Sequence, residues 1–207
     1  MFFDRVDGSF VSADFNLDGI DDVLTRLDFD LATLAGSASG FQSPLATSGV
    51  GGRSVCVADM NGDNIPDLVG GVFYSFQVAL GDGQGQFAIN QSVSLEETLR
   101  DLSCADFNID GNVDVLTARH FLSLFLGVDN AMVSESHQII LEGYSPSNIL
   151  SVDLNFDGFV DLAFIDGDSV VVMLNQLGAT VLIGDVNLDG LVNLLDVGPF
   201  VEVLVNQ

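Results

Sequence analysis

Oxygen-bearing side chains recur along the chain in one short pattern. The pattern Asp-x-Asn-x-Asp-x-x-x-Asp begins at Asp14, Asp59, Asp106 and Asp153, at intervals of 45, 47 and 47 residues. Calcium prefers carboxylate, amide and carbonyl oxygens, and a short loop with such groups at alternate positions can supply most of its ligands. Three carboxylates within nine residues also repel one another unless a cation is present. The pattern therefore predicts four calcium-binding loops.

The four loops predict the same ligands position by position. Side chains at positions 1, 3, 5 and 9 and the backbone carbonyl at position 7 are expected to bind the ion, and position 6 is a turn residue. The second loop has Asn64 at this turn instead of glycine, which the left-handed backbone region tolerates. The alternative is that the loops are Asx turns that only shape hairpins. The predicted ligands are Asp14, Asn16, Asp18, Ile20 and Asp22; Asp59, Asn61, Asp63, Ile65 and Asp67; Asp106, Asn108, Asp110, Asn112 and Asp114; and Asp153, Asn155, Asp157, Phe159 and Asp161.

A fifth copy of the motif follows Asp153 after only 32 residues and ends differently. Its position 12 is a carboxylate, as in an EF-hand, whereas position 12 of the other loops is Thr, Gly or Phe. The predicted ligands are Asp185, Asn187, Asp189, Leu191 through its carbonyl, Asn193 and Asp196. The residues after it predict a short helix, which Gly198 and Pro199 would interrupt.

Short apolar stretches flank each of the first four loops. One precedes the loop and another follows at once, which is the outline of a hairpin with the Asp-rich loop as its connection. A third apolar run and a weaker fourth stretch complete each unit of about 46 residues, which is the period of a propeller blade. The sequence thus predicts an all-β fold, a β-propeller-like array of four calcium-loop blades in residues 1–183, as a closed four-bladed ring or a partial propeller. Residues 184–207 are predicted to form a separate EF-hand-like loop and helix.

Composition excludes several classes of partner and of protein. The chain of 207 residues has 30 acidic and 5 basic side chains, a formal net charge of -25, so nucleic acid and anionic membranes are disfavoured. The apolar content of 48% excludes a disordered acidic tail, and no apolar run is long enough for a membrane span. No signal peptide is visible in the first residues. Cys56 and Cys104 lie at nearly equivalent places in the repeat and are expected to be small buried hydrophobic residues rather than a bridge.

The remaining polar residues do not predict catalysis. His120 and His137 accompany no nucleophile motif and are expected to be structural. Glu96 with Glu97, and Asp166 with Asp168, are carboxylate pairs of the type that glycosidases use, although acids in turns are usually solvated. The absence of Trp disfavours a sugar-stacking platform. We expect no catalytic residues, no organic cofactor and no enzymatic activity.

Two family resemblances rest on these motifs. The four units resemble FG-GAP or VCBS repeats, the calcium-loop blades of integrin-alpha-like propellers, through the Asp-x-Asn-x-Asp-Gly loop between two strands and the trailing Gly-rich turn and Phe, as in GDGQGQF. The tail GDVNLDGLVNLLDVGPFVEVL is similar to one half of a type I dockerin. These resemblances imply an extracellular or bacterial cell-surface adhesion module that binds about four to five calcium ions and a protein or glycan ligand. A cohesin-like partner for the tail is also implied. The alternatives are a fragment of a secreted polysaccharide-active enzyme and an assembly module that docks through its tail.

Overall fold

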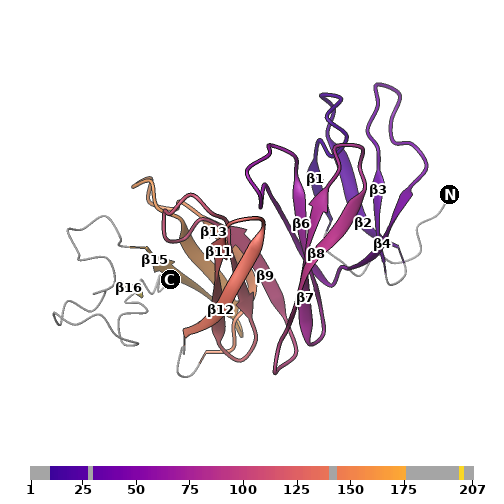
Figure 1. Ribbon diagram of the computed structural model, residues 1–207. Coiled ribbons are helices and arrows are strands. Elements are labelled where there is room, and N and C mark those ends of the chain that lie inside the picture. Colours follow the sequence, from indigo (N-terminus) through magenta and orange to yellow (C-terminus); the bar gives the residue numbers. More distant parts are fainter. Residues whose placement is uncertain (1–9, 28–29, 140–143, 176–200, 203–207) are drawn as a thin grey trace.

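The computed structural model describes residues 10–27, 30–139, 144–175 and 201–202, and every regular element in this part of the chain is a β-strand (Figure 1). The all-β prediction is therefore confirmed. Within the same residues, no helix has the length and apolar character needed to cross a membrane.

The strands form four antiparallel sheets, each with four strands in chain order. Sheet 1 contains β1 (Val11–Ala13), β2 (Asp22–Leu27), β3 (Asp30–Leu34) and β4 (Leu45–Gly51). Sheet 2 contains β5 (Ser54–Ala58), β6 (Asp67–Val72), β7 (Ser75–Gly81) and β8 (Phe87–Ser94). Sheet 3 contains β9 (Asp101–Ala105), β10 (Asp114–Ala118), β11 (Leu122–Val128) and β12 (Met132–Ile139). Sheet 4 contains β13 (Ser147–Val152), β14 (Asp161–Asp166), β15 (Ser169–Leu174) and β16 (Val201–Glu202).

Each Asp-rich loop joins the first two strands of its sheet. The residue before loop position 1 pairs with the aspartate at position 9 in all four sheets, as Ala13 does with Asp22 and Val152 with Asp161. The loop is thus the complete connection of a hairpin, as the flanking apolar stretches predict. The 45- to 47-residue period corresponds to one sheet with its connection to the next.

The apolar core is divided into three layers, one between each pair of successive sheets. Leu24 and Leu31 of sheet 1 pack with Leu68 of sheet 2 in the first layer. The second layer lies between sheets 2 and 3 and includes an edge-to-face contact of Phe76 with Phe125, whose ring centroids are 4.9 Å apart. The third layer, between sheets 3 and 4, contains Leu116, Leu122, Leu162 and Phe164. Each sheet buries apolar residues against its neighbours, so the sheets stabilise one another.

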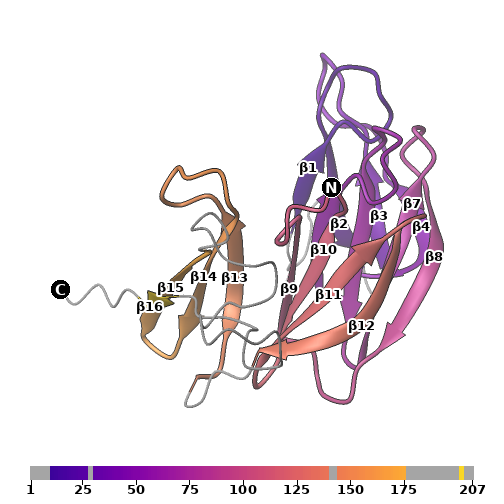
Figure 2. The same ribbon diagram turned by 60° about the vertical axis from the view of Figure 1, so that its left-hand side comes forward.

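The sheets are arranged in a row in which the first strands of successive sheets meet. β1 contacts β5, β5 contacts β9, and β9 contacts β13. Sheets 1 and 4 lie at opposite ends of this row in Figure 1, and Figure 2 shows sheet 4 beside β9 of sheet 3. Among the described residues, β13 makes no comparable contact with β1. The described strands therefore form an open row of four sheets and not a closed four-membered ring.

The predicted C-terminal helix is wrong at the two residues of the tail that the structure describes. Val201 and Glu202 form β16, which pairs with β15 through Leu174 and Met173. The local sequence agrees with this result, because Val201 and Val203 are β-branched and favour extended backbone. The tail thus provides the fourth strand of sheet 4. The fifth loop, from Asp185 to Asp196, lies outside the described residues.

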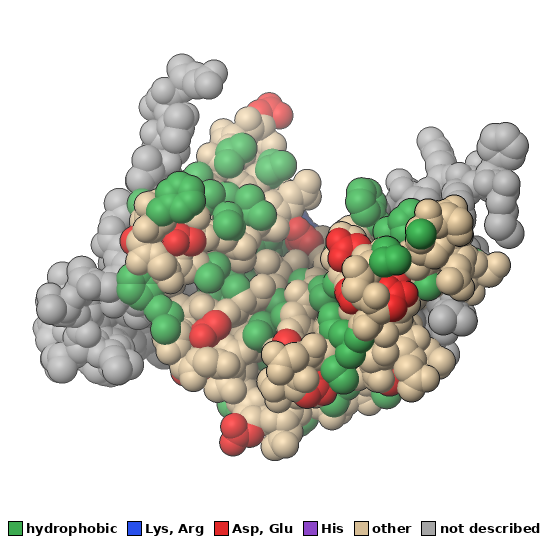
Figure 3. Space-filling model, turned by 90° about the horizontal axis from the view of Figure 1, so that it is seen from above, with side chains coloured by type: hydrophobic (Ala, Val, Ile, Leu, Met, Phe, Trp, Pro, Cys, Tyr) green, Lys and Arg blue, Asp and Glu red, His purple; other side chains and the backbone are tan. Residues whose placement is uncertain are grey.

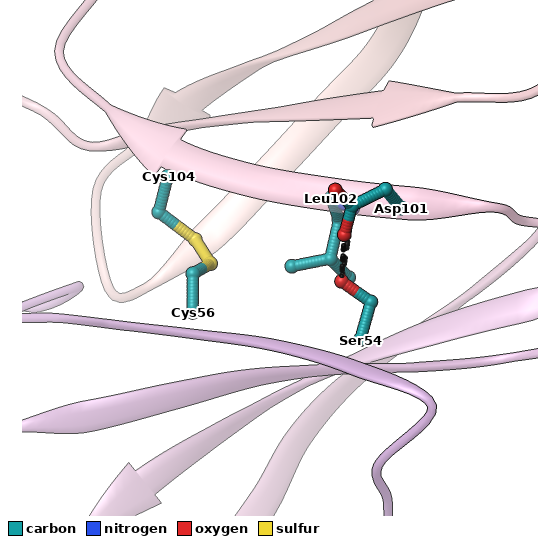
Figure 4. The surroundings of a disulfide bond; sticks show 5 residues. All are labelled: Ser54, Cys56, Asp101, Leu102 and Cys104. Atoms are coloured by element: carbon teal, nitrogen blue, oxygen red, sulfur yellow. Dashed lines mark hydrogen bonds between the residues drawn. A yellow bond between two sulfur atoms is a disulfide. The ribbon is translucent and has the colours of Figure 1, made fainter. Parts of the chain in front are cut away.

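The prediction of two unpaired cysteines is also wrong. Cys56 on β5 and Cys104 on β9 form a disulfide between sheets 2 and 3, with a Cα separation of 5.9 Å (Figure 4). Cys56 lies three residues before its loop and Cys104 only two residues before its own. Because successive side chains of a strand point to opposite faces, this difference of one residue directs Cys56 toward sheet 3 and Cys104 toward sheet 2.

Removing this disulfide should lower stability without changing the fold. The bond closes a loop of 48 residues, so the Cys56→Ala/Cys104→Ala variant should lose about 2 to 4 kcal/mol of unfolding free energy. Urea denaturation of the oxidised protein and of the variant measures the difference. A reductant should destabilise the natural chain and leave the variant unaffected. Two alkylatable thiols in the native, oxidised protein would contradict the bond.

Candidate functional site

The side chains at positions 1, 3 and 5 of each loop all fold back onto the loop backbone. In the second loop, the Asp59 carboxylate accepts the N–H groups of Asp63 and Asn64, at 3.1 and 2.8 Å. The Asn61 carbonyl oxygen accepts the N–H of Asp63 at 2.9 Å, and the Asp63 carboxylate accepts the N–H of Ile65 at 2.8 Å. The same four bonds recur in the other three loops. Oxygens from three alternate residues are thereby held around one turn.

The backbone of the loops is left-handed at two positions. Position 6 has positive φ throughout, and Asn64 adopts it with a φ of 63°, as the sequence predicts. Position 4 also has positive φ, which the sequence did not suggest for Leu17, Ile109 and Phe156, with φ of 59°, 60° and 62°. Only the second loop has glycine there, at Gly62. Bulky apolar residues in this region are strained by about 1 kcal/mol or more, so the loop hydrogen bonds must hold them there.

These apolar residues are exposed at the loop end of the molecule. Phe156 is 91% exposed, and Leu17 and Ile109 are each about half exposed. A view onto this end shows groups of acidic side chains with hydrophobic side chains beside them (Figure 3). The predicted ligands of each loop therefore share one surface with solvent-facing apolar groups.

The aspartate at position 9 has a different role from the others. Asp22, Asp67, Asp114 and Asp161 are fully buried. One carboxylate oxygen of each accepts the N–H of loop position 2, at 2.9 to 3.0 Å. The other oxygen accepts an N–H at the end of the third strand, from Gly36, Gly81, Gly127 or Asn175, at 2.7 to 2.8 Å. This carboxylate therefore clamps the start of the loop to the third strand.

One sequence feature, a glycine at the end of the third apolar run, could have predicted this clamp, but the position 9 aspartates were interpreted as calcium ligands. A glycine ends the third apolar run in three of the four units, at Gly36, Gly81 and Gly127. A Cβ at any of these three would lie within 2.4 Å of a backbone carbonyl oxygen at loop position 8. The glycine is required because the strand end passes directly over the loop, where its N–H reaches the buried carboxylate.

The position 9 carboxyl groups of two loops have raised pKa values, mainly because they are buried and in smaller part because other carboxylates lie near them. Burial raises the pKa of Asp114 to about 6, while the N–H groups of Gly127 and Phe107 lower it and the nearby carboxylates of Asp110 and Asp106 raise it. Burial likewise raises the pKa of Asp67, with smaller contributions from its own loop carboxylates. The charges at positions 1, 5 and 9 therefore repel one another across each of these loops, and a cation among them would remove that repulsion.

The residue set fits calcium in ligand type and in loop closure. Positions 1, 3 and 5 supply oxygen atoms, and each oxygen that accepts one N–H keeps a second lone pair for a cation. As the side chains stand, no three carboxylates, histidines or cysteines in the described part of the chain converge into a metal-binding group. The position 9 aspartates, predicted as ligands, already have both oxygens bonded to buried N–H groups. Calcium would therefore draw the side chains of positions 1, 3 and 5 together on a backbone that already has its turn.

A groove between sheets 2 and 3 is a second candidate site. It is lined by β8 residues Gln91 to Ser94, by Leu95 and Glu96, and by Arg119, Phe125, Val133 and Ser134 of sheet 3. The Gln91 amide bonds the N–H and carbonyl of Val133, at 2.8 and 3.1 Å, which fixes β8 beside β12. Arg119 is only 3% exposed, and burial lowers the pKa of its guanidinium, which the carboxylates of Glu97 and Glu96 oppose. Its Nη2 atom donates to Ser123, whereas its Nε atom has no hydrogen-bond partner.

Comparison with known proteins finds similarity in the fold alone. No family model matches the sequence, and no curated protein matches it. A solved structure of an Agrocybe aegerita lectin, described as recognising non-reducing terminal N-acetylglucosamine, superposes with a TM-score of 0.60 at 18% identity, over 83% of this chain and 50% of the lectin. The N-terminal part of BBS1, a propeller-like structure solved in complex with ARL6, superposes with a TM-score of 0.55 at 11% identity, over 80% of this chain and 53% of that one. The chain thus spans about half the length of these two structures.

The clamp and the loop tip should respond differently to mutation. In a calcium-free buffer with chelator, Asp22→Ala leaves the buried N–H groups of Phe15 and Gly36 without acceptors and should cost about 2 to 4 kcal/mol. Asp18→Ala in the same loop removes an exposed acceptor from Ile20, which water replaces, and should cost less than about 1 kcal/mol. Urea denaturation of both variants tests this difference. Equal losses would show that position 9 is not a structural clamp.

Proposed function

We propose that the chain is a calcium-binding, propeller-like interaction module that acts outside the cell and has no catalytic activity of its own. The observation that carries this proposal is the fourfold recurrence of one loop, with the same hydrogen bonds at positions 1, 3 and 5 in every sheet. A turn that only shaped a hairpin would need one Asx side chain, whereas each of these loops has at least three carboxylates and one amide. Calcium loops explain this excess of oxygen ligands.

Bound calcium would supply positive charge to each group of carboxylates. In the first loop, Asp14, Asn16 and Asp18 would hold the ion with the carbonyl of Ile20, and the corresponding residues would do so in the other loops. Asp22 would keep the loop attached to the third strand while it contributes its charge to the site. The module would thus be stabilised where calcium is abundant, which is the extracellular environment.

The disulfide supports the same location. Bonds of this kind form and persist in oxidising compartments and are rare in reducing ones. Cys56 and Cys104 join the first strands of sheets 2 and 3, next to the second apolar layer. The protein would bind its protein or glycan ligand in a compartment that maintains both the disulfide and the calcium.

Calcium should raise the melting temperature substantially. If each loop has a dissociation constant of about 0.1 to 1 mM, then about 10 mM calcium stabilises the fold by roughly 1.4 to 2.7 kcal/mol per site. Thermal melts of the natural chain in chelator and in calcium measure this effect. Magnesium at the same concentration is the control, because it requires a tighter octahedral site and should stabilise less.

Loop variants make the same test site-specific. Asp110→Ala should remove one calcium ion from the stoichiometry measured by titration calorimetry and reduce the calcium-dependent shift. Asp129→Ala, an exposed aspartate outside the loops, should change neither. A melting temperature that calcium does not change would exclude the proposal.

Glycan binding in the groove between sheets 2 and 3 is a second candidate function. The groove offers hydroxyl, amide, carboxylate and guanidinium groups from Ser92, Ser94, Gln91, Glu96 and Arg119, beside the ring of Phe125. Such a mixture of donors and acceptors suits a polyhydroxylated ligand. The fold is also shared with a lectin.

A glycan array that includes terminal N-acetylglucosamine tests this candidate. If a glycan binds in the groove, Glu96→Ala should weaken its affinity about tenfold or more, because a charged acceptor is lost. Asp129→Ala, at an exposed site outside the groove, is the matched control and should not change the affinity. Equal affinities for the two variants, or no bound glycan, would refute glycan binding at this groove.

A further inference from the structure

Each sheet has a forward face, which is the one directed toward the next sheet in the chain, and a rear face toward the preceding sheet. The three apolar layers show which repeat positions lie on each face. The side chains at loop position 2, which are Phe15, Met60 and Phe107, point forward. Leu24, Val69 and Leu116, each two residues after loop position 9, also point forward. The residue four positions before the loop and the first residue after loop position 9 point to the rear. Interfaces between sheets 1 and 2, 2 and 3, and 3 and 4 therefore repeat one pattern.

The forward face of sheet 4 has apolar residues at positions of this pattern, and no other sheet of the described residues packs against it. At loop position 2, Phe15, Met60 and Phe107 are buried in the next sheet, whereas the equivalent Leu154 is 38% exposed. On β13 the burial alternates, with Leu150 and Val152 exposed on the forward side and Ile149 packed against sheet 3 on the other.

Further apolar residues extend this surface across sheet 4. Ile165 on β14 is 37% exposed, whereas the equivalent Ala118 of sheet 3 is fully buried against sheet 4. Val170 on β15 is 63% exposed, while its neighbour Val171 points to sheet 3 and is buried. The forward face of sheet 4 is thus an apolar interface of the repeating type for which the described part of the chain supplies no partner sheet.

The rear face of sheet 1 is the complementary half of the same interface. Four positions before the loop, Val55 and Leu102 are buried against the preceding sheet, but Phe10 is 73% exposed. Directly after position 9, Leu68, Val115 and Leu162 are fully buried, while Val23 is only half-buried. The two ends of the row therefore expose the two sides of one recurring contact. Among the described residues, β13 and β1 make no contact comparable to those between successive sheets.

We propose that the forward face of sheet 4 binds the rear face of sheet 1 of a second copy of this chain, so that two copies close head to tail into one ring of eight sheets. The contact continues an interface that the chain already makes three times, and the chain supplies both of its sides. A head-to-tail interface closes into a ring when the rotation from copy to copy permits, and two copies then share a twofold axis.

The charge of the protein sets the conditions for association. Each copy has a formal net charge of -25, so two copies repel one another at low ionic strength. At about 0.15 M salt the Debye length is about 8 Å, which screens most of the repulsion between distant surface groups. The contact faces named above are apolar, so their attraction does not decrease with salt. Association should therefore become stronger as salt rises from about 0.01 to 0.15 M.

Analytical ultracentrifugation of the whole chain at about 0.15 M salt in calcium is the direct measurement. The expected mass is twice that of the 21.9-kDa chain. Leu150→Asp and Phe10→Asp should each weaken dimerisation on the order of a hundredfold, because each buries a charge in an apolar contact. Both residues are exposed in the single chain, so far-UV circular dichroism and the melting temperature of the monomer should stay unchanged. Val128→Asp, which changes an exposed valine of sheet 3 outside both faces, should remain dimeric.

A mixture of the two variants tests the head-to-tail geometry. The Leu150→Asp chain keeps an intact rear face and the Phe10→Asp chain an intact forward face, so mixing them should restore one junction and form a heterodimer. A dimer made by two copies of one face would not be restored in this way. A monomer at all concentrations would overturn the proposal, since another segment or partner must then cover sheet 4. Assemblies larger than two copies would overturn the closed ring.

Discussion

The buried carboxylate at loop position 9 is the interaction on which the rest of the architecture depends. Asp22 and its three equivalents bond the N–H of loop position 2 on one side and the end of the third strand on the other. The side chain at position 2 is then inserted into the next sheet, as Phe15 is in sheet 2. One side chain thus links the loop, its own sheet and the contact between sheets. A carboxylate is suited to this task because it has two oxygens that accept hydrogen bonds in opposite directions.

This arrangement joins metal binding to packing. One nine-residue loop contains both the residues proposed to bind calcium and the residue that fills the next apolar layer. The carboxylate at position 9 interacts electrostatically with the proposed calcium ligands and accepts a hydrogen bond from the residue in the apolar layer. A second polar connection joins the first strands of three sheets at their ends opposite the Asp-rich loops. Asp101 on β9 accepts a hydrogen bond from the Ser54 hydroxyl on β5 (Figure 4). It also accepts the N–H of Ile149 on β13, so one carboxylate connects three sheets. Carboxylates therefore organise both ends of the sheet contacts.

The sequence predicts the structural features that are local and repeated, and it does not predict those that depend on contacts between distant residues. The hairpins, the left-handed turn at Asn64 and the all-β class follow from spacing and turn chemistry. The disulfide was missed because the repeat suggested equivalent positions for the two cysteines. Cys56 and Cys104 are in fact offset by one residue relative to their loops, so their side chains face each other between sheets 2 and 3. β16 was missed because its two residues pair with a strand nearly 30 residues earlier. The clamp was missed because an aspartate at position 9 satisfies a ligand pattern equally well. Ring closure depends on rotations between sheets that no local motif encodes.

The disulfide also determines how the chain bears mechanical load. Cys56 and Cys104 are 48 residues apart, and the covalent loop between them contains β6, β7 and β8 entirely. When tension is applied to the flanking segments, force passes through the sulfur bridge and not through those strands. Roughly 160 Å of contour length is thereby withheld from extension. Sheets 1, 3 and 4 can lengthen under load, while sheet 2 remains as a fixed element in the middle of the row.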